Sequence, residues 1–165
     1  MDKIDKTVET LQAVNTINNN KGVLEGYNTD VTGFLLGLEN IKKLNTKKPV
    51  IVLGAGGAAE SVVYSLHLLG VKNIYIMNRT KIKAQRIARK YKEAQTAKWI
   101  EYDLVNEAGL IVNTTSLGMI GYPTLPISLE RASKSTKVYD IVYNPLETKL
   151  IKDAKKLKLE YVTGL

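Results

Sequence analysis

The sequence has no cysteine, a single histidine and no apolar run long enough to cross a bilayer. Without cysteine neither a disulfide nor a thiolate metal site can form, and His67 alone cannot make a histidine-rich one. Residues 1–5 lack the apolar core that a signal peptide needs. We therefore expect a cytoplasmic protein without a metal and without a membrane partner.

Aromatic residues are also few, at 7% of 165 residues, and the 16 acidic residues are outnumbered by 24 basic ones. The formal net charge of +8 suits anionic partners such as phosphates, carboxylates or nucleic acid. No segment interleaves aromatic and arginine side chains as a nucleic-acid surface does, so we expect a small-molecule partner and no nucleic acid. In the alternative interpretation the lysines, for example those in 152–158, only solvate helix faces.

The hydrophobic fraction of 44% allows a real core, and its patterning divides the chain in two. Residues 13–17 and 23–27 are β-like runs around the turn-rich segment 18–22, which predicts a hairpin. Apolar residues at helical spacing follow from Val31 to Ile41, and Asn28 or Thr29 can cap that helix. A polar connector over 42–49 leads into a more regular part.

Beyond this connector, apolar strands alternate with helical segments. We predict strands at 50–53, 73–77, 99–102, 110–112, 138–142 and 160–162, and helices at 58–69, 81–91 and 146–157. Strands that are apolar on both faces indicate a parallel sheet with helices on both sides. The prediction is an α/β, Rossmann-like parallel sheet over 45–165, preceded by a linking helix over 29–44 and a short β-hairpin within 1–28.

The segment VLGAGGAAES, residues 52–61, joins the first of these strands to its helix. Gly54, Gly56 and Ala59 fit the G-x-G-x-x-G/A pattern, in which the glycines make a tight turn and let a pyrophosphate approach the backbone. The helix amides and dipole then face the phosphates. A tight turn without a ligand is the alternative, and the extra bare position of Gly57 favours the ligand. The predicted contacts are Gly54, Ala55, Gly56, Gly57 and Ala58.

The end of the second strand, Asn78-Arg79-Thr80, indicates which dinucleotide binds. NAD enzymes place an acidic residue near this point for the ribose hydroxyl, and no carboxylate stands here to repel a 2′-phosphate. Arg79 can pair with that phosphate and Lys83 follows one turn later, so we expect NADP rather than NAD. A solvated arginine at a helix start is the alternative, which the helix dipole disfavours unless an anion compensates.

A polar loop follows another strand at Asn113, and ligands of open parallel sheets bind beyond such strand ends. Taken alone the loop is an ordinary turn. Together with the glycine segment it indicates a second set of cofactor contacts, near the nicotinamide ribose, for which we name Asn113, Thr114, Ser116 and Met119.

These motifs resemble those of the shikimate dehydrogenase family, NADP enzymes that interconvert 3-dehydroshikimate and shikimate in aromatic amino acid (chorismate) biosynthesis. They occur in the family's order over nearly the whole chain, and the Asn-Thr-Asp and Tyr-Asn-Pro pieces are the specific ones. The matching segments are AVNT at 13–16, GYNTD at 26–30, GAGGA at 54–58, NRT at 78–80, NTTS and GM within 113–119, DIVYNP at 140–145 and TGL at 163–165.

The resemblance implies roles for further residues. It makes Asn15 and Asp30 ligands of the ring hydroxyls, and Asp30 also half of a Lys–Asp catalytic pair. It places Tyr143 near the substrate, and Ile141 and Gly164 near the nicotinamide. Without the resemblance, Asp30 reads as a first-turn acid of a helix and Tyr143 as a core aromatic.

The chain also departs from the family pattern. The family's catalytic lysine and serine-containing substrate motif precede the position of Met1, its closing helix follows Leu165, and Gln12 stands where it usually has glycine. The resemblance therefore makes 1–28 a remnant of a substrate domain. We expect the chain to bind NADP but to turn over shikimate poorly or not at all, and its uncovered surface allows a homodimer.

Two other functions stay open at this stage. One is an NADP-binding module without chemistry. The other is a Rossmann-type reductase of another substrate class, such as glutamyl-tRNA reductase, which also carries an Asn-Arg-Thr. The Asn-Thr-Asp and Tyr-Asn-Pro segments and the absence of a catalytic cysteine argue against the reductase.

Overall fold

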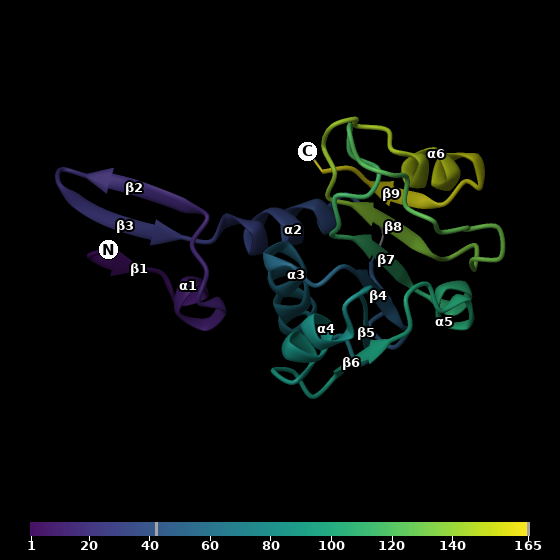
Figure 1. Ribbon diagram of the computed structural model, residues 1–165, viewed down its shortest axis with the longest axis horizontal. Coiled ribbons are helices and arrows are strands. Elements are labelled where there is room, and N and C mark those ends of the chain that lie inside the picture. Colours follow the sequence, from purple (N-terminus) through teal and green to yellow (C-terminus); the bar gives the residue numbers. More distant parts are fainter. Residues whose placement is uncertain (42, 165) are drawn as a thin grey trace.

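The computed structural model describes residues 1–41 and 43–164, which form a small lobe and a large lobe joined by a helix (Figure 1). Lys42, in the predicted connector, and Leu165, in the last predicted motif, lie outside the described residues. The small lobe holds a three-stranded sheet in the order β1-β3-β2, and the large lobe holds a six-stranded sheet in the order β6-β5-β4-β7-β8-β9.

The predicted hairpin is confirmed as β2 (Thr16–Asn20) paired antiparallel with β3 (Val23–Tyr27). Its first strand, however, lies three residues later than 13–17, and the asparagines assigned to the turn belong to the strand. The reason is a two-residue turn in which both Lys21 and Gly22 have positive φ, 51° and 92°, a conformation that matches the twist of a hairpin. The Asn19 side chain closes it by accepting a hydrogen bond of 2.9 Å from the Gly22 amide.

The sequence patterns do not predict two short elements at the start of the chain. β1 (Lys3–Ile4) pairs parallel with β3, and α1 (Lys6–Leu11) is capped by the Asp5 carboxylate, which accepts from the Val8 amide at 2.7 Å. A two-residue strand carries no periodicity and depends on its tertiary partner. The C-cap of α1 is Gln12 in the left-handed conformation, φ 55°, where glycine is the preferred residue.

The connecting helix is α2 (Thr29–Glu39), and Asn28 caps it as predicted, accepting from the Asp30 amide at 3.2 Å. It ends at Glu39 and not near 44. The helix packs on the large lobe, where the Phe34 ring stacks on Tyr139 with ring centroids 4.8 Å apart. A Cβ at Gly37 would lie 2.0 Å from the Tyr139 hydroxyl oxygen, so the helix approaches this tyrosine as closely as a glycine allows.

The large sheet is entirely parallel, and its order confirms the Rossmann-like prediction, with the topological switch between β4 and β7. Its strands and helices are β4 (Val50–Leu53), α3 (Gly57–Leu68), β5 (Ile74–Met77), α4 (Lys81–Ala88), β6 (Ala94–Ala97), α5 (Tyr102–Glu107), β7 (Leu110–Asn113), β8 (Lys137–Asp140), α6 (Lys149–Lys156) and β9 (Glu160–Val162).

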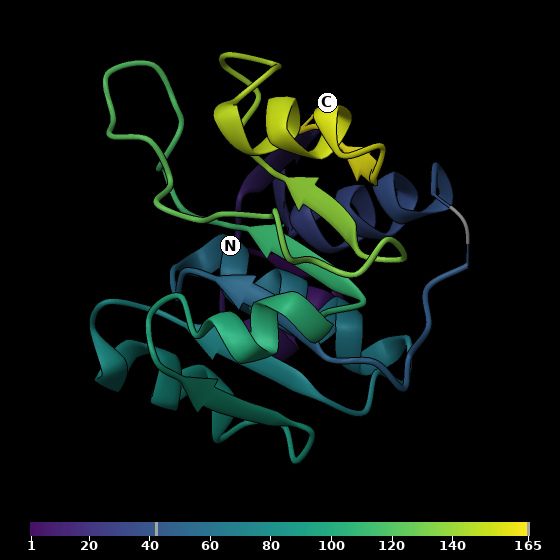
Figure 2. The ribbon, with the colours of Figure 1, turned by 90° about the vertical axis from the view of Figure 1, so that its right-hand side faces the viewer.

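Helices cover both faces of this sheet, as predicted. Alternate residues of β4 point to opposite sides, so that Val50 and Val52 join one core with α2, α3 and α4, while Ile51 and Leu53 join the other with α5 and α6. In Figure 2, α5 and α6 lie on the near side of the sheet and α2 lies behind it. The crossover from β7 to β8 has no helix among its described residues and covers the second core with the buried side chains of Leu125, Ile127 and Leu129.

Three further elements differ from the prediction by three residues or more at one end. The strand expected at 99–102 is wrong: the edge strand is β6, whose Ala-Gln-Thr-Ala sequence is too polar to predict, and Tyr102 begins α5. The helix expected over 81–91 ends at Ala88. The helix expected over 146–157 begins only at Lys149, because the Thr148 side chain caps it by accepting from the Ile151 amide at 3.3 Å.

In the part of the chain that the structure covers, every helix is too short or too polar to cross a membrane.

Candidate functional site

The candidate site begins at the carboxyl end of β4, beside the switch point of the sheet, where the glycine segment turns into α3. Gly54 has φ 112°, and a Cβ there would lie 2.5 Å from the Thr114 hydroxyl oxygen. Thr114 sits this close because its amide and hydroxyl both donate to the Leu53 carbonyl, at 2.8 and 2.7 Å. The fold itself therefore requires glycine at position 54.

Gly56 and Gly57 differ from Gly54 in this respect. A Cβ built at either position meets no atom within 4 Å, and neither has the positive φ that favours glycine. Gly56 is the N-cap of α3 and carries no side chain to cap the first amides of the helix. These bare, exposed positions leave room for a group to approach the backbone, which a purely structural turn would not need.

A cavity of about 260 Å³ lies against this turn. It brings together residues from three strand ends that the sequence analysis assigned to the cofactor, including Arg79 and Lys83. Both cations are exposed and lie near the start of α4, whose first turn holds no acidic residue. The predicted residues on its wall are Gly54, Ala55, Gly56, Asn78, Arg79, Thr80, Lys83, Thr114 and Ser116.

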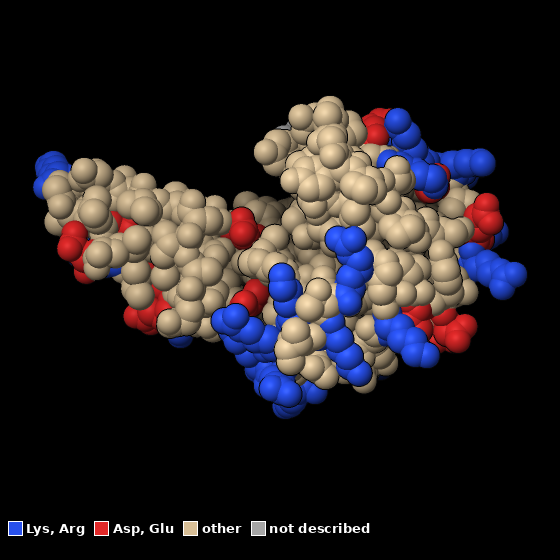
Figure 3. Space-filling view, viewed as in Figure 1, with Lys and Arg blue, Asp and Glu red and all other residues tan. Residues whose placement is uncertain are grey.

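The charge distribution of the surface agrees with this geometry. In the space-filling view, Lys and Arg side chains gather around α4 on the large lobe, whereas the small lobe is largely uncharged with a few groups of either sign (Figure 3). Cations near a helix N-terminus oppose the helix dipole, and a bound anion offsets that cost.

Two residues of the predicted loop lie elsewhere. Asn113 is fully buried, and its side chain is used inside the protein: its Nδ2 donates to the Leu117 carbonyl at 3.1 Å and to Asp140 at 2.9 Å. Its Oδ1 accepts from the Thr115 amide and hydroxyl at 3.1 and 2.7 Å. Met119 is half-buried and does not line the cavity at the glycine turn. It does not line the larger cavity described in the next paragraph either.

A larger cavity of about 580 Å³ lies on the other side of the α3 start, between α2 and the end of β8. The predicted residues on its wall are Asp30, Ala58, Ile141, Tyr143 and Gly164. Tyr143 is 59% exposed, so it is not a core aromatic. Gly164 belongs here by packing, since a Cβ would lie 2.2 Å from the Ile141 carbonyl oxygen.

Asn15 and Asp30, fifteen positions apart in the sequence, are hydrogen-bonded at the edge of this larger cavity. The Asn15 Nδ2 donates to the Asp30 carboxylate at 2.7 Å, while its Oδ1 accepts from the Thr29 amide at 3.0 Å. Asn28 holds the two segments together by donating to the Ala13 carbonyl at 3.2 Å. Asn15 and Asp30 are both exposed, so an amide and a carboxylate face solvent side by side.

Sequence reasoning missed several residues of both walls. Thr115, Leu117 and Trp99 also line the smaller cavity. Phe34 and Tyr139 line the larger one from α2 and β8. Only Thr115 carried a usable signal, because it lies inside the quoted loop motif.

The residues present fit a phosphorylated dinucleotide. The smaller cavity offers bare backbone at a helix start and two cations, and the larger one continues past α3 with apolar walls and a polar pair at its edge. Within residues 1–41 and 43–164, no group of three or more His, Asp or Glu could hold a metal ion.

Comparison with known proteins gives a consistent result. The family model described as shikimate / quinate 5-dehydrogenase matches residues 36–120, about half of the chain. The "Shikimate dehydrogenase (NADP(+))" of Caldanaerobacter subterraneus is 38% identical over 173 residues, covering 100% of this chain and 61% of that protein.

Solved structures agree over the same span. Quinate dehydrogenase from Corynebacterium glutamicum in complex with NAD is 30% identical with a TM-score of 0.89, and 99% of this chain covers 61% of it. Shikimate 5-dehydrogenase from Thermus thermophilus in complex with NADP(H) and shikimate is 32% identical with a TM-score of 0.84, and 99% of this chain covers 60% of it. The chain thus spans about three fifths of the length of the proteins it matches.

Proposed function

The chain belongs to the shikimate/quinate dehydrogenase family, and from that premise we propose that it is the NADP-binding portion, with part of the substrate-binding portion, of an NADP-dependent shikimate dehydrogenase. The division proposed is residues 1–28 for the substrate portion, 29–44 for the linking segment and 45–165 for the cofactor domain. The bare, exposed position of Gly56, on the wall of a cavity that Arg79 and Lys83 also line, carries the cofactor proposal. Gly57 is equally bare but does not line that cavity.

Each cavity has its own part in this proposal. The amides at the start of α3 and the turn residues bind the dinucleotide phosphates, and Arg79 with Lys83 binds the 2′-phosphate. When bound, the nicotinamide ring would give or accept the hydride of a ketone–alcohol interconversion. Ile141 and Gly164 bound the space for that ring, in the larger cavity.

Asn15, Asp30 and Tyr143 receive the substrate at the same cavity. The Asn15 amide and the Asp30 carboxylate offer a donor and acceptors for neighbouring ring hydroxyls, and the 2.7 Å bond between them fixes both. In the family's catalytic pair, Asp30 would hold the partner lysine and help to move the proton at the reacting oxygen.

Calorimetric titration with NADP⁺ and, separately, NAD⁺ tests the cofactor proposal. We expect tighter binding of NADP⁺, and a loss of about tenfold or more in Arg79→Ala, since one charge-assisted hydrogen bond contributes about 1.5–3 kcal/mol. Arg86→Ala is the matched control, because Arg86 is an exposed arginine on α4 that does not line the cavity. Equal affinity for the two dinucleotides, or an unchanged affinity in Arg79→Ala, would contradict the assignment, and binding of neither would contradict the cofactor site altogether.

The homodimer and the cytoplasmic location stay predictions. Ile4, Ile17 and Leu24 lie on one face of the small sheet and are 45%, 61% and 40% exposed, and this is the face through which two copies would associate.

A further inference from the structure

One buried acid has no part in the proposed chemistry. Asp140 ends β8 with its side chain fully buried, and no substrate or cofactor group can reach it there. Burying an ionisable group is costly unless hydrogen bonds compensate. Its place between the two cavities calls for an explanation.

The Asp140 carboxylate accepts hydrogen bonds from three separate segments. Oδ1 accepts from the Asn113 side chain at 2.9 Å and from the Val142 amide at 3.1 Å. Oδ2 accepts from the Thr148 hydroxyl at 2.6 Å. Burial raises the pKa of Asp140 above its ordinary value. The hydrogen bonds from Thr148, Val142 and Asn113 act in the opposite direction but do not cancel this effect.

The contact with Asn113 reaches the wall of the smaller cavity. Because the Asp140 Oδ1 accepts from the NH₂ of Asn113, the Asn113 oxygen is turned toward Thr115. That oxygen accepts twice from Thr115, and the Thr115 hydroxyl in turn accepts from the Leu117 amide at 3.0 Å. Thr115 and Leu117 both line the cavity assigned to the dinucleotide phosphates.

The contact with Val142 reaches the other cavity. Val142 lies between Ile141 and Tyr143, and both of these neighbours line the larger space. The buried Asp140 carboxylate is thus hydrogen-bonded both to Asn113, which holds the wall of the smaller cavity, and to Val142, beside the wall of the larger one. The dinucleotide would lie between these two walls.

We propose that Asp140 is a positioning residue, which acts through Asn113 to hold the loop 114–117 in the shape that receives the cofactor and keeps that loop in register with 141–143. The consequence for cofactor binding rests on the proposed function, whereas the effect on the loop does not. A purely structural residue would change stability alone.

The contact with Thr148 supplies a matched control. Thr148→Val removes the hydroxyl that bonds Oδ2 and caps α6, but it leaves the bonds of Oδ1 intact. Asp140→Ala removes all three bonds. Asp140→Asn keeps the shape and an oxygen for Asn113 and Val142, and its amide can donate to the Thr148 hydroxyl oxygen.

Two readouts test the proposal on the whole chain. Hydrogen exchange of the Thr115 and Leu117 amides, relative to amides of β5, is measured without cofactor. We expect it to speed up by about tenfold or more in Asp140→Ala and to stay near the wild-type value in Asp140→Asn and Thr148→Val. NADP⁺ affinity by calorimetry should follow the same order, with a loss of about tenfold or more only in Asp140→Ala.

Unchanged loop exchange in Asp140→Ala, or equal effects in Thr148→Val, would overturn the proposal. If Asp140→Ala does not fold, Asn113→Asp carries the test, since it keeps the oxygen for Thr115 and replaces the donor facing Asp140 with a second carboxylate. The same acceleration is expected there, and its absence would count against the proposal. If the wild type does not bind NADP⁺, the proposed function fails while loop exchange still decides the role of Asp140.

Discussion

At the residue scale, the glycine segment contains two kinds of glycine that the sequence pattern treats alike. Gly54 is required by its own backbone, with φ 112° and Thr114 packed against it. Gly56 has open space where a side chain would be and an ordinary φ of −96°. Folding requires the first glycine, whereas at the second the open space leaves room for a ligand at the start of the helix.

This difference predicts opposite outcomes for two substitutions. Gly54→Ala should destabilise the protein by about 1–3 kcal/mol, because the new Cβ combines strain at positive φ with overpacking. Gly56→Ala should change the free energy of unfolding by no more than about 1 kcal/mol, the preference of an N-cap for glycine over alanine, yet weaken NADP⁺ binding by about tenfold or more. Denaturant unfolding and calorimetry on both variants measure this. A Gly56→Ala protein that binds like the wild type would show that the turn is only structural.

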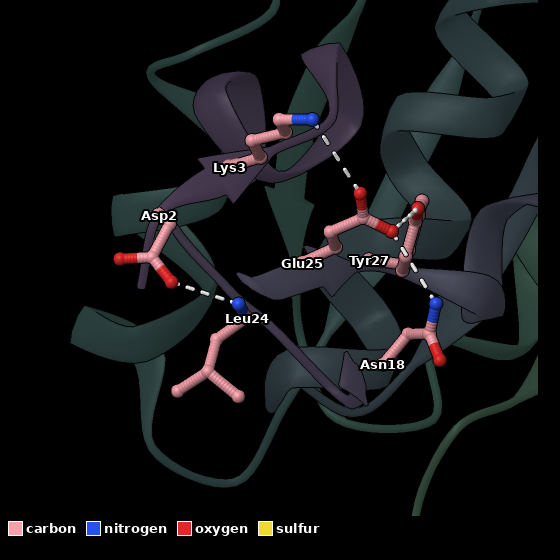
Figure 4. Close-up of polar contacts among 6 residues, drawn as sticks. All are labelled: Asp2, Lys3, Asn18, Leu24, Glu25 and Tyr27. Carbon is pink, nitrogen blue, oxygen red and sulfur yellow. Dashed lines mark hydrogen bonds and ion pairs between the residues drawn. The ribbon is translucent and has the colours of Figure 1, made fainter. Parts of the chain in front are cut away.

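At the element scale, successive strand residues of the small sheet point to opposite faces, which brings Lys3, Asn18 and Glu25 together on its more polar face. Glu25 is the centre of the polar face, where its carboxylate accepts from the Tyr27 hydroxyl at 3.1 Å and from the Asn18 amide at 3.3 Å and pairs with Lys3 at 3.7 Å (Figure 4). Hydrogen bonds from Tyr27 and Asn18 hold the pKa of Glu25 below its ordinary value of 4.5.

This sheet should therefore loosen in acid before the large one does. A carboxylate with a lowered folded-state pKa stabilises the fold above its unfolded pKa of 4.5, and that stability is lost as the pH falls through the folded value. We expect amide protection of β3 to fall relative to that of β4 as the pH is lowered from about 5 to about 2. Glu25→Gln is the control and should flatten that dependence. An identical acid response in both proteins would mean that Glu25 does not carry it.

At the scale of the whole molecule, α2 links the two lobes and carries Asp30 at its start. It is seated on the large lobe through Phe34 and Gly37 against Tyr139. The position of the Asn15–Asp30 pair relative to the cofactor domain thus depends on helix packing in the large lobe.

The proposed division of labour predicts weak turnover by this chain. By the family resemblance, none of the 165 residues matches the family's catalytic lysine, and a positioned proton donor contributes about 10²–10⁴-fold to the rate. We expect NADP⁺-dependent oxidation of shikimate at least about 10²-fold slower than that of the Caldanaerobacter relative under the same conditions. Asp30→Asn should leave NADP⁺ affinity unchanged and lower the residual rate further. Turnover at the relative's rate would contradict this reading of the chain.

Local sequence patterns were enough to predict most of the strands and helices of the large lobe. Continuous apolar runs such as 50–53 and the glycines after them reflect short-range physical demands, namely burial on both faces of the sheet and a tight turn. The cap of α2 at Asn28 was readable for the same reason. The family resemblance added Asn15, Asp30 and Tyr143, which pattern alone could not distinguish from a first-turn acid or a core aromatic.

Only the tertiary structure decided the rest, because the deciding contacts join residues far apart in the chain. The edge strand β6 is too polar to predict and exists through its pairing with β5. Asn113 was taken for a ligand contact, yet it is fully buried against Asp140, twenty-seven positions away. The sequence by itself determined the glycine turn and the parallel α/β alternation, which follow from local backbone geometry and burial. Which polar side chains face the cavities and which are used inside depends on packing across strands, and no local pattern records it.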